Sequence, residues 1–190
     1  MPDAMLAGLI FLLNTVFDLY LLVFIIRLIL VWSGANYFNP LTQFIVKLTD
    51  FLVVPIRRFI PNYRRLELSS ILIIFILEII KFFLVSMVSF GFPNFLGIII
   101  LAFGDCLKLI ILTFFYAILA QAILSWIQTQ TPINQILYQI TSPILRPLQR
   151  IIPPVSGFDI SPIPALIGLQ LLIFILINPI MALGLGIAVG

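Results

Sequence analysis

Four long apolar stretches limit this chain more than any other feature of its sequence. They run over about residues 8–32, 69–90, 95–126 and 163–188. A helix needs about 20 mainly apolar residues to cross a bilayer, where it satisfies its own backbone hydrogen bonds. Hydrophobic residues make up 63% of the chain and charged residues only 9%, whereas soluble domains carry about 25% charged residues. The sequence therefore predicts an all-α integral membrane protein with four transmembrane helices.

Basic residues indicate how these helices are oriented. Of the ten Lys and Arg residues, seven lie in the two long links between spans: Lys47, Arg57, Arg58, Arg64, Arg65, Arg146 and Arg150. The short link at residues 91–94 has none. Because cytoplasmic loops are enriched in Lys and Arg, we expect both long links in the cytosol and both termini on the outer side.

The two halves of the chain repeat one pattern. Trp32 closes the first span as Trp126 closes the third, and residues 55–61 (PIRRFIP) align with residues 147–153 (PLQRIIP). Each half has a membrane helix, an interfacial segment and a second membrane helix. The halves are residues 1–94 and 95–190, with interfacial segments 39–61 and 131–154. Both halves enter from the same side, which predicts a parallel repeat about a pseudo-twofold axis along the membrane normal.

Each interfacial segment begins with apolar residues at helical spacing. They are Leu41, Phe44, Ile45, Leu48 and Leu52 in the first copy, and Ile133, Ile136, Leu137, Ile140 and Ile144 in the second. A short helix with one apolar face and basic neighbours lies in the headgroup plane. Because proline cannot donate a helical hydrogen bond, we expect Pro143, Pro147, Pro153 and Pro154 to prevent the second of these helices from continuing.

Four arginines near the ends of these segments are candidates for binding a partner. Arg57, Arg58, Arg146 and Arg150 can reach the phosphates of anionic lipids or the carboxylates of a membrane protein partner. Two other interpretations of the segments stay open. They are basic loops that only fix the topology, or they are re-entrant elements of a pore.

A family resemblance is carried by residues 142–154 (SPILRPLQRIIPP) and 157–162 (GFDISP). They resemble the signature of the YggT family, also called YlmG-like, and residues 39–61 resemble its other repeat copy. The resemblance implies a multi-pass protein of the bacterial plasma (inner) membrane with no established catalytic residues. It also implies roles in osmotic stress, cell division or envelope organisation, and, in plastids, in membrane-complex assembly and nucleoid distribution. Val54 replaces the arginine seen at Arg146, so the second copy is the better preserved site.

Six charged residues lie inside the spans: Asp18, Arg27, Glu78, Lys81, Asp105 and Lys108. Each costs roughly 2.5–3.5 kcal/mol to insert. Asp18 and Lys81 have similar depth in antiparallel spans, so we expect them to pair, with Glu78 one turn from Lys81. Asp105 and Lys108 form a second such pair, and Arg27 is expected to snorkel to the headgroups. The set is interpreted either as structural salt bridges or as an ion or proton path.

The residue types that are missing exclude much chemistry. The chain has no histidine, and its one cysteine, Cys106, lies in an apolar run and is interpreted as a packing residue. A Cys/His zinc site, a His-ligated haem and a Ser-His-Asp nucleophile are therefore excluded. We expect no catalytic residues, no metal and no cofactor, and the basic residues beside the spans do not indicate nucleic-acid binding.

Two functions are favoured over an enzyme, which would have to rely on Asp, Glu, Lys or Ser alone and for which the sequence shows no cluster of suitable spacing. The first is a non-enzymatic protein that organises partners or lipids at the cytosolic membrane face. The alternative is a small ion or osmolyte channel or transporter, for which a homo-oligomer is required because four helices pack solid around their side chains.

Overall fold

The computed structural model describes the chain except residues 1, 35–37, 128–131 and 153–158. The described elements are α1 (Pro2–Ser33), α2 (Pro40–Arg57), α3 (Leu68–Ser89), α4 (Phe95–Ile127), α5 (Pro132–Ile151), α6 (Pro162–Leu172), the π-helix η1 (Ile173–Ile177) and α7 (Asn178–Val189). Four stretches of helix within the described residues are long and apolar enough to cross a membrane: Ala4–Ser33, Leu68–Ser89, Phe95–Ser125 and Pro162–Val189. The predicted all-α membrane fold with four spans is confirmed.

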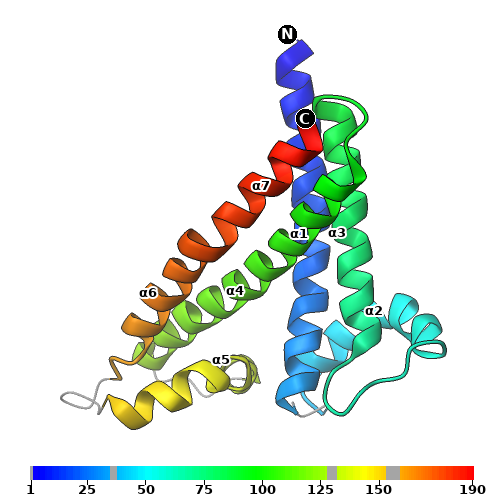
Figure 1. Ribbon diagram of the computed structural model, residues 1–190. Helices are drawn as coiled ribbons and strands as arrows, with labels where there is room; N and C mark the ends of the chain where they lie inside the picture. Colours follow the sequence, from blue (N-terminus) through cyan, green and yellow to red (C-terminus); the bar gives the residue numbers. More distant parts are fainter. Residues whose placement is uncertain (1, 35–37, 128–131, 153–158) are drawn as a thin grey trace.

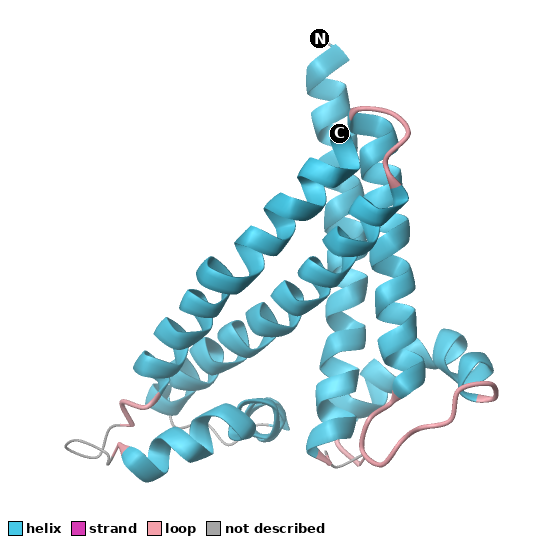
Figure 2. Cartoon of the chain, viewed as in Figure 1, coloured by secondary structure: helices cyan, strands magenta, loops and turns pink. Residues whose placement is uncertain are grey.

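The membrane-length helices form two legs that meet at one end (Figure 1). α1 and α3 run antiparallel in one leg, and α4 packs along α6, η1 and α7 in the other. Both termini and the turn between α3 and α4 lie at the end where the legs converge. α2 and α5 lie at the opposite end, where the legs spread apart (Figure 2). This arrangement separates the interfacial segments from the termini by the length of the spans.

The core joins the two halves near the end that carries α2 and α5. Leu21, Phe24 and Ile25 of α1 are fully buried, and their cluster includes Ala117 of α4 and Ile140 of α5. The outer surface is apolar as well: large hydrophobic side chains along the spans are extensively exposed, among them Phe11 and Phe174. Such a surface requires lipid as its solvent.

A proline explains the one irregular turn in the last span. Pro179 lacks a backbone N–H, so the helix cannot keep its normal bonding there. The backbone N–H of Asn178 donates to the carbonyl of Ile173, five residues back, and η1 results. The span continues through this bulge to Val189, so the π-turn bends the helix without ending it.

The expectation that Pro143 and Pro147 end the second interfacial helix is wrong. α5 continues through both prolines to Ile151, and α2 likewise contains Pro55. The carbonyl of Gln139 loses the bond that residue 143 would donate, but it accepts one from the Ser142 hydroxyl at 3.1 Å. A side-chain donor thus replaces the missing backbone donor, and the helix is preserved.

The apolar faces of α2 and α5 are used differently. In α2, Leu41, Phe44 and Leu48 are exposed, whereas Ile45 and Leu52 pack against the core. In α5, Ile136 and Ile140 are buried in the core, and Ile133 is exposed. Both helices thus pack one part of the apolar face against the spans, and α2 leaves the larger part of its face open to lipid.

Small residues set the close approach of α4 and α7. A Cβ atom at Gly97 would lie 2.3 Å from the backbone nitrogen of Ala188. We expect Gly97→Ala to destabilise the fold by about 1–3 kcal/mol, because this backbone contact leaves no room for a methyl group. The midpoint of unfolding in sodium dodecyl sulfate measures the effect.

Gly168→Ala is the matched control. A Cβ atom at Gly168 would have nothing within 4 Å, so this variant should unfold at the same detergent concentration as the natural protein, or slightly above it. Equal losses in both variants would show that the contact between α4 and α7 is not the cause.

Candidate functional site

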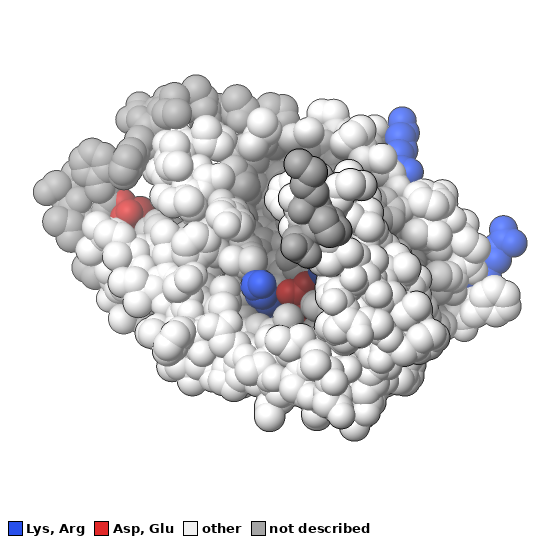
Figure 3. Space-filling view, turned by 90° about the horizontal axis from the view of Figure 1, so that it is seen from above, with Lys and Arg blue, Asp and Glu red and all other residues white. Residues whose placement is uncertain are grey.

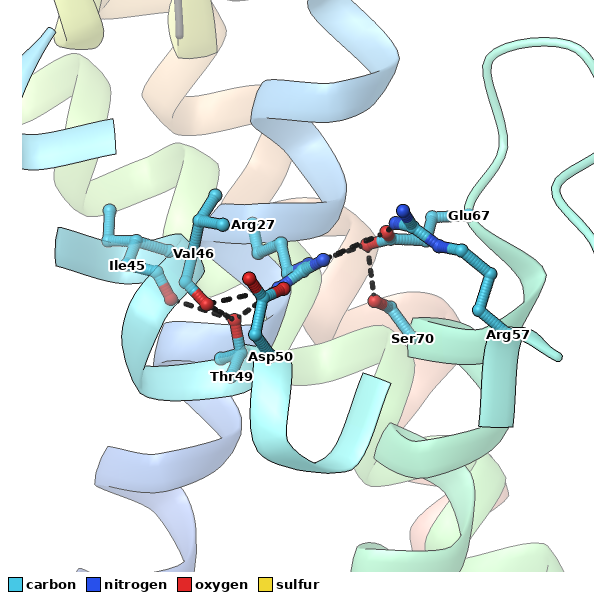
Figure 4. A network of polar contacts seen from close by, with 8 residues as sticks. All are labelled: Arg27, Ile45, Val46, Thr49, Asp50, Arg57, Glu67 and Ser70. Atoms are coloured by element: carbon cyan, nitrogen blue, oxygen red, sulfur yellow. Dashed lines mark hydrogen bonds and ion pairs between the residues drawn. The ribbon is translucent and has the colours of Figure 1, made fainter. Parts of the chain in front are cut away.

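A first polar cluster surrounds Arg27, which lies in α1 near the end that carries α2 (Figure 4). Its Nε and Nη2 atoms donate to the two carboxylate oxygens of Glu67 at 2.7 and 3.1 Å. Its Nη1 atom donates to Thr49 Oγ1 at 2.6 Å and to Asp50 Oδ1 at 2.8 Å. Figure 4 shows the guanidinium reaching between α2 and the start of α3. Arg27 therefore holds three helices together.

The expectation that Arg27 snorkels to the headgroups is wrong. Its side chain is only 3% exposed, and Glu67 is fully buried. Glu67 also pairs with Arg57 and accepts a hydrogen bond from Ser70 Oγ at 2.5 Å. The returning chain brings Glu67 to the depth of Arg27, and a buried bidentate pair replaces solvation by headgroups.

In the second half, the contact between Arg27 and Thr49 has a counterpart that two uncharged side chains make. Gln121 lies five residues before Trp126, as Arg27 lies five residues before Trp32. The Thr141 hydroxyl donates to the side-chain oxygen of Gln121, in the position of the contact between Thr49 and Arg27. The spacing to tryptophan, which sequence reasoning did not apply to Gln121, was the signal that could have identified this residue.

One more contact of the first half, between two side chains ten residues apart in the sequence, has a counterpart in the second half. Gln149 Nε2 donates to Asp159 Oδ2 at 2.8 Å, as Arg57 donates to Glu67. Partial burial raises the pKa of Asp159, but hydrogen bonds from Ser161 and Gln149 outweigh it and hold the pKa below its ordinary value. Two polar contacts thus recur at matched positions in the two halves, and in the second half neutral glutamines stand in place of Arg27 and Arg57.

A second polar cluster brings together five of the six charged residues that the sequence places inside the spans, all except Arg27. Lys81 Nζ lies 2.9 Å from Asp18 Oδ1 and 2.7 Å from Glu78 Oε2, and it also pairs with Asp105. Lys108 Nζ is 3.8 Å from Asp105 Oδ1. The structure therefore contains the contact between Asp18 and Lys81 that their matched depth predicts. Three carboxylates face two ammonium groups, which gives this cluster a formal charge of −1 when all five are ionised.

Asp18 connects this cluster to the surface. Its side chain is 44% exposed, whereas Lys81 and Glu78 are buried. It lies in a cleft of about 300 Å³ between α1 and α4, whose lining includes Thr15, Thr113 and Tyr116. Viewed from the end that carries the termini, acidic and basic atoms are visible within a hollow between the helices (Figure 3).

A third site, named here the arginine pocket, lies at the opposite end. It is a cavity of about 390 Å³ lined by Trp32, Ser33, Arg65, Ser142, Pro143, Arg146, Pro147 and Arg150. Two of the four predicted arginines, Arg146 and Arg150, thus line it. Arg57 belongs to the Arg27 cluster instead, and Arg58 is exposed at the end of α2. The structure therefore does not bring the four predicted arginines together.

Arg65 was missed because its place depends on a tight turn. Tyr63 and Leu66 exchange two backbone hydrogen bonds of 3.1 and 2.9 Å, and Arg64 adopts a positive φ of 54°. This turn carries Arg65 from the loop before α3 into the pocket. The adjoining signature residues Pro153, Pro154, Gly157 and Phe158, and the side chain of Trp126, lie outside the described residues.

Comparisons with known proteins agree with this architecture. The model of the CCB3/YggT family matches residues 6–88 and 100–180, one match in each half. An uncharacterised Vibrio alginolyticus protein is 37% identical over 176 residues, which cover 87% of this chain and 91% of that protein. The uncharacterised protein YggT of Escherichia coli K12 is 39% identical over 154 residues, or 80% of each chain. No solved structure matches. The family match in both halves and these relatives together show that the chain belongs to the CCB3/YggT family.

Proposed function

We propose that this protein is a non-enzymatic, multi-pass protein of the bacterial inner membrane that organises anionic lipids, and through them partner proteins, at the cytosolic face. One observation carries the proposal: the end that holds α2 and α5 has an excess of basic residues whose charge the protein does not balance. Each basic residue near an anionic membrane surface contributes about 1 kcal/mol of attraction.

The acids at this end are already engaged within the protein. Asp50 pairs with Arg27, and Glu67 pairs with both Arg27 and Arg57. Asp159 accepts a hydrogen bond from Gln149. The remaining bases at this end are Lys47, Arg58, Arg64, Arg65, Arg146 and Arg150, and they are available for anions supplied from outside.

Lipid retention tests this proposal. The protein is purified from native membranes, and the headgroups that remain bound are measured. A variant with Arg58, Arg64, Arg146 and Arg150 changed to glutamine should retain severalfold less anionic lipid, because four attractive charges are lost. A variant with the same lipid composition as the natural protein would contradict the proposal.

The sidedness of the protein is part of this proposal. If the basic segments face the cytosol, the C-terminus faces the outside, because α7 ends at the opposite end from α2 and α5. A C-terminal phosphatase fusion should then be active, and a fluorescent fusion that matures only in the cytosol should be dark. The reverse pattern would overturn the assigned sidedness.

A second candidate function is ion or osmolyte transport. The observation that favours it is the partly exposed carboxylate of Asp18 in the cleft between α1 and α4, in contact with Lys81. Such a path needs a second copy of the chain, which would close the open side of the cleft. Liposomes containing the protein should then show flux under a gradient, and Asp18→Asn should reduce it; absence of flux in the natural protein would remove this candidate.

Lipid organisation fits the roles that the family resemblance implies. Envelope and osmotic stress, cell division and membrane-complex assembly all depend on which lipids and proteins gather at one place in the membrane. An organising role requires none of the residue types that the chain lacks.

A further inference from the structure

The arginine pocket lies where the two halves of the molecule meet. Trp32 and Ser33, from the end of α1, and Arg65, from the loop before α3, form the part that belongs to the first half. Arg146 and Arg150 of α5 form the part that belongs to the second. The volume of about 390 Å³ falls within the range of about 300–1,000 Å³ that small-molecule sites occupy.

The positive charge in the pocket has no counterion in the protein. Arg146 and Arg150 lie one turn apart on one helix face, where like charges repel, and Arg65 adds a third guanidinium. Within the parts of the chain that the structure describes, no carboxylate pairs with any of the three. The acids at this end bond to Arg27, Arg57 and Gln149 instead. Among the described residues, three arginines line this pocket and no acid does, which favours an external anion as the partner of their charge.

The unbroken helix gives this pocket its geometry. Because α5 continues through Pro143 and Pro147, Arg146 and Arg150 stay on one face and both prolines line the cavity. The Arg146 guanidinium lies over the ring of Tyr138, 5.4 Å from its centroid. Stacking restricts a guanidinium while its N–H groups remain able to donate in a planar fork. The site is thus preorganised on the side of the second half.

We propose that the arginine pocket binds a phosphate-ester anion, which joins the two halves through Arg65 on one side and Arg146 and Arg150 on the other. Guanidinium groups bind phosphate through paired hydrogen bonds. The proposal rests on the proposed function and narrows it from a diffuse basic surface to one site.

The first half offers no second copy of this site. In the aligned register, Phe51 and Val54 stand where the second copy has Pro143 and Arg146. Arg58 is the counterpart of Arg150, and both are exposed, but only Arg150 lines the pocket. Arg58 and the neighbouring turn residue Arg64 therefore provide a control with the same loss of charge.

The experiment counts lipids retained by the full-length protein. Nanodiscs of phosphatidylcholine with a small share of phosphatidylglycerol are ejected into a native mass spectrometer, and bound phosphatidylglycerol is counted per chain. Arg146→Ala/Arg150→Ala should retain at least tenfold less than the natural protein, whereas Arg58→Ala/Arg64→Ala, which removes the same charge outside the pocket, should lose a much smaller share of the bound lipid. Arg65→Ala should lose a similar amount of bound phosphatidylglycerol. Because Arg65 lies in a loop outside α5, this variant tests the pocket even if the α5 variant misfolds.

The outcomes separate the site from the broader function. Equal losses in the pocket variant and the control variant would show diffuse attraction only, which overturns the pocket and leaves the proposed function intact. If neither variant lost bound lipid, both the pocket and the proposed function would be overturned. Arg146→Lys/Arg150→Lys keeps the charge but removes the planar forks, so retention close to that of the natural protein would also contradict the pocket.

A second arm identifies the source of the phosphate. Detergent-solubilised protein is heated with inorganic phosphate or glycerol 3-phosphate at constant ionic strength. A raised unfolding temperature in the natural protein, absent in Arg65→Ala, would assign the site to a soluble phosphate compound. Retention of phosphatidylglycerol without such a shift would assign the site to a lipid headgroup. If neither the soluble phosphates nor phosphatidylglycerol bound, the proposal would be overturned.

Discussion

Lys81→Met should destabilise the folded protein by about 3–5 kcal/mol, the cost of removing one partner from a buried ion pair. Lys81 is 2% exposed and contacts the carboxylates of Asp18, Glu78 and Asp105. Without it, three carboxylates remain at one level of the membrane with no nearby cation except Lys108. The amount of folded protein recovered from membranes and the midpoint of detergent unfolding should both fall sharply.

Lys108→Met is the matched control for this prediction. Lys108 is 40% exposed and lies 3.8 Å from Asp105, a geometry in which a pair contributes only about 0–1 kcal/mol. Adding Glu78→Gln and Asp105→Asn to Lys81→Met should restore much of the loss, because the uncompensated charges are then removed. The structural interpretation fails if Lys81→Met accumulates normally but loses ion flux; that result would favour a conducting role for the cluster.

Arg27→Leu should produce a loss of similar size, again about 3–5 kcal/mol. Arg27 in α1 donates hydrogen bonds to Thr49 and Asp50 of α2 and to Glu67 at the start of α3. The substitution leaves the fully buried Glu67 carboxylate with Arg57 and Ser70 as its remaining partners. The first half of the molecule should therefore unfold at a lower detergent concentration. Tryptophan fluorescence of Trp32, measured in a background with Trp126→Phe, reports on this half.

The second half contains a natural comparison. Gln121 occupies the position of Arg27 and is bonded to Thr141 without any charge. Gln121→Leu should cost only about 1 kcal/mol, as for one neutral hydrogen bond. Replacing both Arg27 and Glu67 with leucine should recover part of the loss seen with Arg27→Leu, since it leaves no buried charge of this pair unmatched. Equal effects at Arg27 and Gln121 would contradict the assigned role of the ion pair.

The sequence predicts the membrane helices well because their length and apolarity have a direct physical cause. The second span, expected over about residues 69–90, is α3, Leu68–Ser89. The contact between Asp18 and Lys81 is predictable as well, because two antiparallel helices of known direction fix the relative depth of their residues. Both inferences need only the bilayer as a boundary and the rise of a helix.

Contacts that depend on returning segments are not predictable in the same way. Arg27 was expected at the headgroups because nothing in its own span shows that Glu67 comes back to the same depth. Pro143 was expected to end a helix because the compensating bond from Ser142 to Gln139 depends on one rotamer. Arg65 reaches the arginine pocket only through the turn between Tyr63 and Leu66. The first of these contacts joins segments distant in sequence, and the other two depend on a rotamer and a turn conformation that no sequence pattern shows.

The divergence of the two legs toward α2 and α5 gives the molecule the outline of a wedge. A wedge takes up more area in one leaflet than in the other, so membrane bending becomes part of its energetics, as it does for interfacial amphipathic helices. The protein should be most stable where the leaflet that holds α2 and α5 is convex. In small vesicles, reconstitution should therefore favour the orientation with α2 and α5 outside, and protease access to the loop before α3 measures that preference. From this shape we expect the position of the protein in a membrane to depend on curvature, independently of any ligand.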